Sequence, residues 1–255
     1  MFNDILLQCQ ESYVKIKCCH EHYTSCDCYN CKPNGLENMF YNPSQLTSGD
    51  GYYCEKKMLY YVISYGDTYV NEFYNYLSVS KLLNRFKGSL KVLSLGCGFC
   101  PDYYAMLKYI GEENLDTQLL YNGIDNSYSW DKTRIMSLPN LTYQVFDLTD
   151  STKSIQFHEF DIITINKIFS TLYGLNKHEY FLESIKNAVE NTMKSSAALI
   201  FGDVNNKEMG RDVFDQTISP YFNNIRRFYT AGYTGNNWIK LSDMHTKTVF
   251  FEYRK

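Results

Sequence analysis

The sequence lacks three features that would place the protein in a simple class. No run approaches the about 18 consecutive apolar residues that a membrane-spanning helix requires. There is no basic excess: 25 Lys and Arg stand against 28 Asp and Glu, for a net charge of −3. A nucleic-acid clamp would normally carry a basic stripe, so the charge does not favour one. Proline is scarce, at 5 residues, while tyrosine reaches 24, which is typical of an ordered globular chain.

Cysteine is confined to the first 100 residues, and its placement excludes one class of fold. A secreted disulfide scaffold follows a signal peptide and spreads its cysteines in pairs. The first residues instead include Asp4 and Glu11 and lack the apolar core of a signal peptide. We therefore expect an intracellular protein, cytoplasmic or nuclear. Seven of the nine cysteines precede position 55: Cys9, Cys18, Cys19, Cys26, Cys28, Cys31 and Cys54.

The bunched cysteines lie beside His20 and His22, which indicates a metal site. Zinc prefers four thiolate or imidazole ligands, and closely spaced cysteines supply them at little cost in chain entropy. Cys28 and Cys31 form a C-x-x-C half-site, and Cys26 adds a third thiolate. We predict one or two structural zinc ions, while free buried thiols and a redox pair stay open as alternatives. The predicted ligands are Cys18, His22, Cys26, Cys28 and Cys31, with Cys19, His20 and Cys54 able to complete the set.

The composition divides the chain into three parts. Residues 1–50 form the Cys/His-rich segment, residues 51–88 an aromatic-rich helical connector, and residues 89–255 a larger domain. In the connector, apolar residues recur at three- and four-residue spacing, which predicts a helix with a break at Gly66. An aromatic stripe of this kind is typical of a helix that packs on a sheet; a stacking platform for nucleobases is the alternative. The stripe consists of Met58, Val62, Tyr65, Tyr69, Phe73, Tyr76 and Leu77.

Beyond Gly88, short apolar runs alternate with helical segments, which predicts an α/β fold with a doubly wound, mostly parallel sheet. The last two strands lack a helix between them, so we expect an antiparallel pair at the end of a seven-stranded sheet. The predicted strands are 91–95, 119–124, 141–146, 161–165, 197–202, 225–229 and 246–253. The predicted helices are 102–110, 129–137, 178–194 and 211–221.

A glycine-containing loop follows the first predicted strand. Gly96 and Gly98 allow the backbone to approach a ligand where a Cβ would clash. The helix that begins with Pro101 and Asp102 offers free N–H groups at its start. A dinucleotide fingerprint has a third glycine where Pro101 stands, and no Gly-Lys-Ser/Thr motif of a P-loop is present. We expect Cys97 and Cys100 in this loop to be packing residues.

Four motifs in order resemble those of the class I S-adenosylmethionine-dependent methyltransferases. The first is the glycine loop, and the second is Asp125, the acidic residue that closes the next strand. The third is Asp147 after the third strand, and the fourth is the run from Phe160 to Asn166. The resemblance covers about residues 89 to 255 and implies an S-adenosylmethionine-binding Rossmann-like fold.

The resemblance also assigns roles to residues at the carboxyl ends of the strands. It implies that Asp125 binds the ribose hydroxyls, that Asp147 binds the adenine amino group, and that Leu148 or Phe146 packs on the adenine ring. Asn166 would face the sulfonium and the acceptor. The cofactor-binding residues that it predicts are Gly96, Cys97, Gly98, Asp125, Asn126, Asp147, Leu148 and Asn166.

The fourth motif departs from several methyltransferase subfamilies. Amino-methylating nucleic-acid enzymes carry an Asn/Asp-Pro-Pro-aromatic signature, where this chain has Asn166, Lys167, Ile168 and Phe169. No cysteine after Cys100 can act as the nucleophile of a cytosine C5 enzyme. The catalytic candidates are therefore Asn166 and Asp203, the latter as a base or as an orienter of an amine. Lys167 and His178 are expected at the surface.

The sequence thus predicts an S-adenosylmethionine-dependent methyltransferase that acts on a nitrogen or oxygen atom. An added N-terminal module commonly recognises a macromolecule, so we expect RNA, DNA or protein as the acceptor and no membrane partner. One alternative is an inactive methyltransferase fold that serves as a zinc-stabilised scaffold. Another is a small-molecule methyltransferase in which the aromatic helix covers an apolar pocket.

Overall fold

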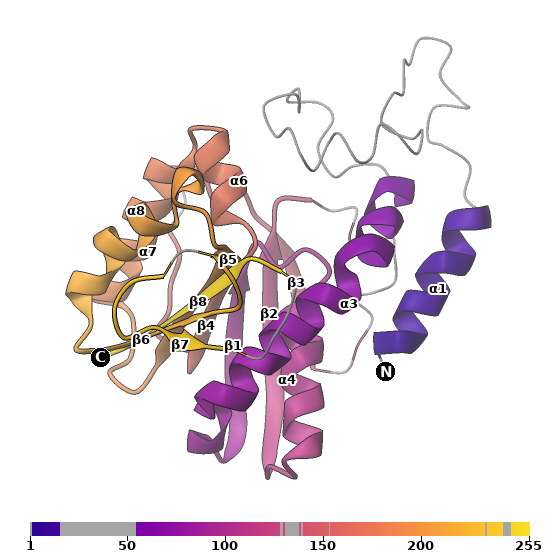
Figure 1. Ribbon diagram of the computed structural model, residues 1–255, viewed down its shortest axis with the longest axis horizontal. Helices are drawn as coiled ribbons and strands as arrows, with labels where there is room; N and C mark the ends of the chain where they lie inside the picture. Colours follow the sequence, from indigo (N-terminus) through magenta and orange to yellow (C-terminus); the bar gives the residue numbers. More distant parts are fainter. Residues whose placement is uncertain are drawn as a thin grey trace.

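The fold is built on an eight-stranded sheet with the order β3-β2-β1-β4-β5-β8-β6-β7 (Figure 1). The computed structural model describes residues 2–15, 55–127, 130, 138, 140–152, 154–232, 234–241 and 246–255. The strands are β1 (Gly88–Leu95), β2 (Thr117–Asp125), β3 (Leu141–Val145), β4 (Ile162–Asn166), β5 (Ala198–Val204), β6 (Asn224–Tyr229), β7 (Ile239–Lys240) and β8 (Thr248–Arg254).

Strands β1 to β5 run parallel, and β8 pairs antiparallel with both β5 and β6. All seven predicted strands form, and the antiparallel pair at the end of the chain is confirmed. The predicted number of strands is wrong, because the two-residue strand β7 adds to the edge of the sheet beside β6. Two residues are too few to produce a periodic signal in the sequence.

Two helical layers cover the sheet. Before the sheet come α1 (Phe2–Lys15) and α3 (Glu55–Ser80); α4 (Pro101–Glu112) follows β1; α6 (Phe169–Gly174) and α7 (His178–Asn191) follow β4; and α8 (Arg211–Ile218) follows β5. Figure 1 shows α3 and α4 on one side of the sheet and α6, α7 and α8 on the other. Within the described residues, no helix is both long and apolar enough to cross a lipid bilayer.

Strand β4 shows why the central strands read as continuous apolar runs. Two consecutive residues of this strand, Ile162 and Ile163, are both fully buried, but they belong to different hydrophobic cores. Ile162 packs in the core under α3 and α4, and Ile163 packs in the core under α6, α7 and α8. A strand covered on both faces has no polar side, which is typical of a parallel sheet between two helical layers.

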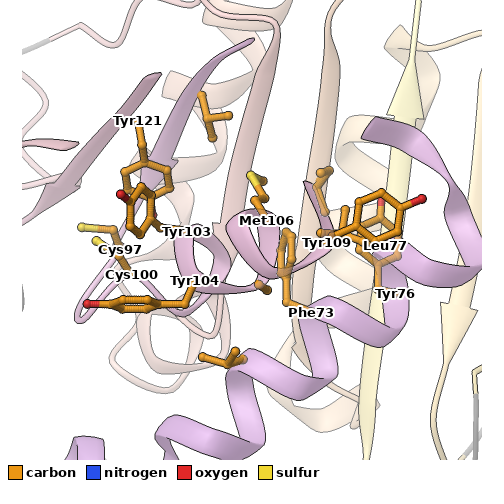
Figure 2. Close-up of a cluster of buried hydrophobic side chains, with 14 of the residues drawn as sticks. Phe73, Tyr76, Leu77, Cys97, Cys100, Tyr103, Tyr104, Met106, Tyr109 and Tyr121 are labelled. Carbon is orange, nitrogen blue, oxygen red and sulfur yellow. The ribbon is translucent and has the colours of Figure 1, made fainter. Parts of the chain in front are cut away.

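Helix α3 is part of the core, as the aromatic stripe predicts. Phe73 and Tyr76 are fully buried, and their rings lie 5.6 and 4.8 Å from that of Phe250 on β8. Figure 2 shows Phe73, Tyr76 and Leu77 in one cluster with residues of α4. Near the middle of the helix, Tyr65 and Tyr69 are only half-buried.

The predicted break at Gly66 is wrong, because α3 continues through this residue. A Cβ at position 66 would lie 2.6 Å from Cζ of Phe2 on α1. Gly66 therefore allows the close approach of two helices. Nothing in the sequence around Gly66 reveals this role, because the contact comes from a helix that the sequence analysis does not predict.

The remaining predicted helices form with small changes. The helix predicted over 178–194 ends at Asn191, and the one predicted over 211–221 ends as α-helix at Ile218, followed by a 3-10 turn over Ser219–Tyr221. Pro220 in this turn has no N–H group to donate to an α-helical hydrogen bond. Most of the helix predicted over 129–137 lies outside the described residues.

Candidate functional site

The carboxyl ends of four parallel strands bring the predicted site residues to one edge of the sheet. Leu95, which ends β1, pairs with Ile124 of β2 on one side and with Ile165 of β4 on the other. Asn166 pairs in turn with Gly202 of β5. Because the strands end level with one another, the loops that follow them meet at the same edge. The order of the sheet reverses between β1 and β4, and ligands of open α/β sheets bind at such a point.

The glycine loop requires glycine for two different reasons. Gly96 and Gly98 have φ angles of +67° and +50°. A Cβ on Gly96 would also lie 2.2 Å from Cδ1 of Ile168, so this residue is held against the segment after β4. A Cβ on Gly98 would meet Cζ2 of Trp130 at 3.4 Å, which is an ordinary contact. At Gly98 the backbone conformation alone favours glycine.

Asp125 binds the glycine loop directly. Its carboxylate accepts hydrogen bonds from the N–H groups of Gly98, at 2.9 Å, and Ser127, at 3.1 Å. Burial raises the pKa of Asp125, and the hydrogen bond from Gly98 opposes this shift. The next residue, Asn126, is exposed. The loop and the acidic residue thus form one unit at the ends of β1 and β2.

Asp147 and Leu148 occupy the turn after β3. The Oδ1 atom of Asp147 accepts hydrogen bonds from the backbone N–H and the hydroxyl of Thr149, at 2.9 and 2.7 Å. This arrangement is an Asx turn, in which the carboxylate stabilises its own loop. The Asp147 side chain is exposed, whereas Leu148 is buried in the core on the α7 side of the sheet. Their contacts with adenine stay predictions.

Asp102 is the second residue of α4, and it is fully buried. It accepts hydrogen bonds from the hydroxyl of Tyr121 on β2, at 2.7 Å, and from the hydroxyl of Thr164 on β4. Burial raises the pKa of Asp102, and the two hydroxyl groups oppose the shift. Asp102 therefore fixes the first turn of α4 on β2 and β4.

Cys97 and Cys100 are packing residues, as expected from the sequence. Both are buried, and Figure 2 shows them beside Tyr103 and Tyr121. The Sγ atom of Cys97 lies 2.7 Å from the position that a Cβ on Gly123 would take. Burial raises the pKa of the Cys97 thiol well above its usual value, and a buried neutral thiol is a poor nucleophile.

Asn166 presents a buried amide group at the end of β4. The residue is 8% exposed, and neither Oδ1 nor Nδ2 has a hydrogen-bond partner among the described residues. Its Oδ1 lies 2.7 Å from the place of a Cβ on Gly202, so Gly202 leaves the space that the amide occupies. A buried amide without partners is costly, and a bound ligand can supply them.

Lys167 is the largest departure from the sequence prediction at this edge. Its side chain is only 9% exposed, so the expectation that it faces solvent is wrong. Its Nζ lies 2.8 Å from Oε2 of Glu72 on α3, donates to the hydroxyl of Thr248 at 2.8 Å, and lies 5.0 Å from the centre of the Tyr69 ring. Glu72 is far away in the sequence, and no local pattern predicts this ion pair.

The carboxylate of Asp203 is hydrogen-bonded to backbone N–H groups. Its Oδ2 accepts from the N–H of Ser170 at 2.9 Å, and its Oδ1 accepts from that of Val204 at 2.7 Å. Burial raises the pKa of Asp203, opposed first by the Ser170 hydrogen bond and then by the charge of Lys167. Asp203 thus fixes the start of α6 just after Asn166 and Lys167, and its role as a base stays a prediction.

His178 starts α7, as predicted, but it is partly buried rather than at the surface. Its ring centre lies 4.5 Å from that of Tyr173 and 6.0 Å from that of Phe169. Asn205, which follows β5, is 6% exposed, and its Nδ2 donates to the carbonyl of Ala231. His178 thus packs on α6, and Asn205 links the segment after β5 to the segment after β6.

A row of aromatic rings joins the glycine loop to Lys167. Trp130 lies beside Gly98, and its ring centre is 6.3 Å from that of Phe99. Phe99 stacks with Tyr69 of α3 at 6.4 Å, and Tyr69 lies under the ammonium group of Lys167. Tyr61 and Tyr65 also contact Tyr69, at 6.1 and 5.7 Å. We call Tyr61, Tyr65, Tyr69, Phe99 and Trp130 the aromatic row.

The predicted zinc ligands lie outside the described residues. Cys18, His22, Cys26, Cys28 and Cys31 belong to the part of the chain between α1 and α3 that the structure does not describe. Among the residues that it does describe, no group of three or more His, Cys, Asp or Glu side chains could hold a metal ion. The zinc site stays a prediction.

Comparisons with known proteins identify the fold. No protein-family model matches the sequence, and no curated protein does either. The N-methyltransferase NodS from Bradyrhizobium japonicum WM9 is 12% identical; the match covers 74% of this chain and 97% of NodS, with a TM-score of 0.50. Its complex with S-adenosyl-L-homocysteine matches at 12% identity over 73% of this chain and 87% of the other, with a TM-score of 0.50.

The CMeT domain of a citrinin polyketide synthase is similar to the same degree. It is 13% identical, with a TM-score of 0.52 over 83% of this chain and 59% of that structure. The order of the parallel strands and the antiparallel strand β8 place the described part of the chain in the same architecture. The chain therefore has the Rossmann-like α/β fold of the class I S-adenosylmethionine-dependent methyltransferases.

Proposed function

We propose that the protein is an S-adenosylmethionine-dependent methyltransferase that methylates a nitrogen or oxygen atom. The observation that carries this proposal is the hydrogen bond from the Gly98 N–H to Asp125, which joins the glycine loop and the acidic end of β2 into one binding edge. The unpartnered amide of Asn166 at the end of β4 fits the same proposal, because a ligand at this edge would supply its partners.

The chain's own residues divide the work of binding and orientation. S-adenosylmethionine, when bound, supplies a methyl group on a positively charged sulfur. Asp125 and Asn126 would hold the ribose, and the turn with Asp147 and Leu148 would hold the adenine. The backbone of the loop from Gly96 to Gly98 would lie against the methionine part. Methyl transfer is a displacement in which positioning contributes most of the rate, and Asn166 is the group that would orient the nucleophile.

For the acceptor, the sequence favours a macromolecule, either RNA, DNA or protein. The support is the extra helical layer of α1 and α3, which lies beside the methyltransferase core and contributes Tyr69 and Glu72 to the site. A small-molecule acceptor is the second candidate. It is favoured by the aromatic row, in which Tyr69 of α3 stacks with Phe99 of the glycine loop.

A thermal-shift experiment tests the cofactor proposal. A ligand that binds only the folded protein raises the unfolding free energy by about 2.7 kcal/mol at 100 times its dissociation constant. We expect S-adenosylmethionine to stabilise the wild type and to lose most of this effect in Asp125→Ala. Asp116→Ala removes an exposed carboxylate just before β2 and should retain the effect. An equal effect of the cofactor on all three proteins would contradict the role of Asp125, and no effect on any would favour an inactive scaffold.

We also propose that the Cys/His-rich segment binds structural zinc inside an intracellular protein. The support is the sequence spacing of Cys26, Cys28 and Cys31 and the thiolate preference of zinc. Metal analysis of the purified chain tests this proposal. Less than about 0.5 equivalents of zinc per chain would contradict it, because a structural metal is retained through purification.

A further inference from the structure

The ammonium group of Lys167 lies in a set of contacts that suit a cation. A carboxylate oxygen of Glu72 and the hydroxyl oxygen of Thr248 each lie 2.8 Å from Nζ. The hydroxyl of Thr248 in turn donates to the other carboxylate oxygen of Glu72, at 2.7 Å. The face of Tyr69 adds a cation–π contact at 5.0 Å. Together, a carboxylate, a hydroxyl and an aromatic face are the groups that recognise ammonium ions.

Two buried carboxylates interact with Lys167, and one of them, Glu72, forms a direct ion pair with it. Two carboxylates, Glu72 and Asp203, are 1% and 2% exposed, and both interact with this single lysine. Burial raises the pKa of Asp203, and its two backbone hydrogen bonds oppose this shift. A buried carboxylate that shares one cation with another is poorly compensated. A second cation bound at this place would therefore be stabilised.

The aromatic row and Asn166 extend the same environment towards the cofactor loop. The row leads from Tyr69 through Phe99 to Trp130 beside Gly98, and its ring faces attract cations. Asn166 ends β4, which pairs with the strand that leads into the glycine loop, and Lys167 follows it directly. The Oδ1 atom of Asn166 has no hydrogen-bond donor among the described residues. An N–H group of a ligand would satisfy this oxygen.

We propose that the methyl acceptor is an amine, which the site binds in its cationic form against Tyr69, Glu72 and Asn166. This inference rests on the proposed function and names the substrate class for the same site. The amine enters as R–NH₃⁺ and releases one proton to water. Its nitrogen lone pair then forms the new N–C bond while the C–S bond breaks and its electron pair stays on sulfur.

The product, R–NH₂CH₃⁺, carries the same charge as the amine that entered. The carboxylate of Glu72 therefore suits substrate and product alike. A phenolate or carboxylate acceptor would instead bring a negative charge next to Glu72, which is unfavourable in a buried site.

The affinities of two cofactor analogues for the full chain test the proposal without an identified acceptor. In sinefungin, a carbon with a primary amine replaces the methyl-bearing sulfur, so a cation lies where the methyl group and the acceptor nitrogen would meet. S-adenosylhomocysteine has a neutral sulfur and no methyl group. We expect calorimetry to show that the wild type binds sinefungin at least roughly fivefold more tightly than S-adenosylhomocysteine.

Variants on α3 identify the groups responsible. Tyr69→Leu removes the aromatic face and should bring the affinity ratio close to one, whereas Tyr69→Phe keeps the face and should preserve the ratio. Glu72→Gln removes the charge at nearly constant size and should also lower the ratio. Glu113→Gln, in an exposed ion pair with Lys81, is the matched control and should leave the ratio unchanged.

The outcomes separate this inference from the proposed function. If neither analogue binds, the proposed function fails, and the inference fails with it. If both bind with equal affinity, or if the ratio is the same in Tyr69→Leu and Tyr69→Phe, the cofactor site stands and the amine acceptor is overturned. Tyr69 is only half-buried, so this pair of variants stays informative even where Glu72→Gln does not fold.

Discussion

The ring of Phe2 occupies the space beside Gly66, where a Cβ would lie only 2.6 Å from its Cζ atom. The same ring lies 6.1 Å from Phe99 in the glycine loop and 5.0 Å from Tyr104 of α4, between ring centres. Phe2 of α1 thus packs against both α3 and α4, beside the glycine loop. Gly66 is the position at which this contact is most easily changed.

The first prediction concerns Gly66→Ala. Alanine favours the helix by up to about 1 kcal/mol, but its methyl group displaces Phe2. We expect little change in global stability together with a loss of hydrogen-exchange protection across α1. Gly111→Ala in α4 is the control, since a Cβ there meets no atom within 4 Å. It should stabilise the protein by about 0.5 kcal/mol and leave α1 protected. Retained protection of α1 in Gly66→Ala would show that Phe2 does not hold this helix.

The second prediction separates two requirements for glycine. Gly88 and Gly96 both have positive φ angles, but only Gly96 faces a close neighbour, Ile168. Gly88→Ala should lower the unfolding free energy by about 1 kcal/mol, from the left-handed backbone alone. Gly96→Ala should cost at least about 1 kcal/mol more, because the new methyl group collides with Ile168.

Urea unfolding of both glycine variants and of Gly96→Ala/Ile168→Ala checks this prediction. The double variant removes the collision, so the second substitution should cost less in the Gly96→Ala background than in the wild type. Equal costs in the two backgrounds would mean that Ile168 does not restrict Gly96.

The third prediction is a pH dependence at Asp102. Burial raises its pKa above the ordinary value of 3.8, so the folded protein holds this proton more tightly than the unfolded chain does. The stability that Asp102 contributes is therefore complete below pH 3.8 and is lost as the pH rises through the folded-state pKa. Tyr121→Phe removes a hydroxyl donor that favours the charged carboxylate, so it raises this pKa further.

The destabilisation by Tyr121→Phe should consequently grow with pH, to about 1.5–3 kcal/mol at neutral pH. Unfolding free energies measured from pH 4 to pH 8 check this. Tyr180→Phe, at a residue that is 62% exposed, should show no such trend. A destabilisation by Tyr121→Phe that is constant or falls with pH would mean that Asp102 is not the ionised partner.

The fourth prediction concerns the ion pair between Lys167 and Glu72. Lys167→Met leaves a buried carboxylate without its cation, which typically costs about 3–5 kcal/mol. Glu72→Gln/Lys167→Met removes both charges and should cost clearly less than the sum of the single variants. Lys81→Met, which breaks an exposed ion pair, should leave the stability nearly unchanged. Strict additivity in the double-mutant cycle would contradict a direct pair.

The strands of the sheet other than β7 were predictable because their residues carry a local signal. Residues such as Ile162 and Ile163 are apolar and β-branched, and a strand buried on both faces needs nothing else. Asp125 was predictable for a similar reason, since it is the acidic residue that ends such a strand. For these residues, the order of the strands and the position of a residue along its strand determine where it lies in the sheet.

The contacts between α3 and the rest of the site were not predictable from the sequence. Glu72 and Lys167 meet because α3 lies over the end of β4, and neither residue has a local feature that marks it as buried. Gly66 looks like a helix break in isolation, and only the position of Phe2 explains it. Tertiary packing overrides local propensity at these residues. For the same reason, the sequence does not show that Tyr69 lies under Lys167.

Calorimetric titration of the full chain with S-adenosylmethionine tests the central claim most directly. The glycine loop and Asp125 form a single edge, so we expect saturable binding of one equivalent with a dissociation constant between about 1 µM and 1 mM. We expect Asp125→Ala to weaken this binding and Asp116→Ala to preserve it. No saturable binding at about 1 mM cofactor, or equal binding by Asp125→Ala and the wild type, would contradict a methyltransferase site at this edge.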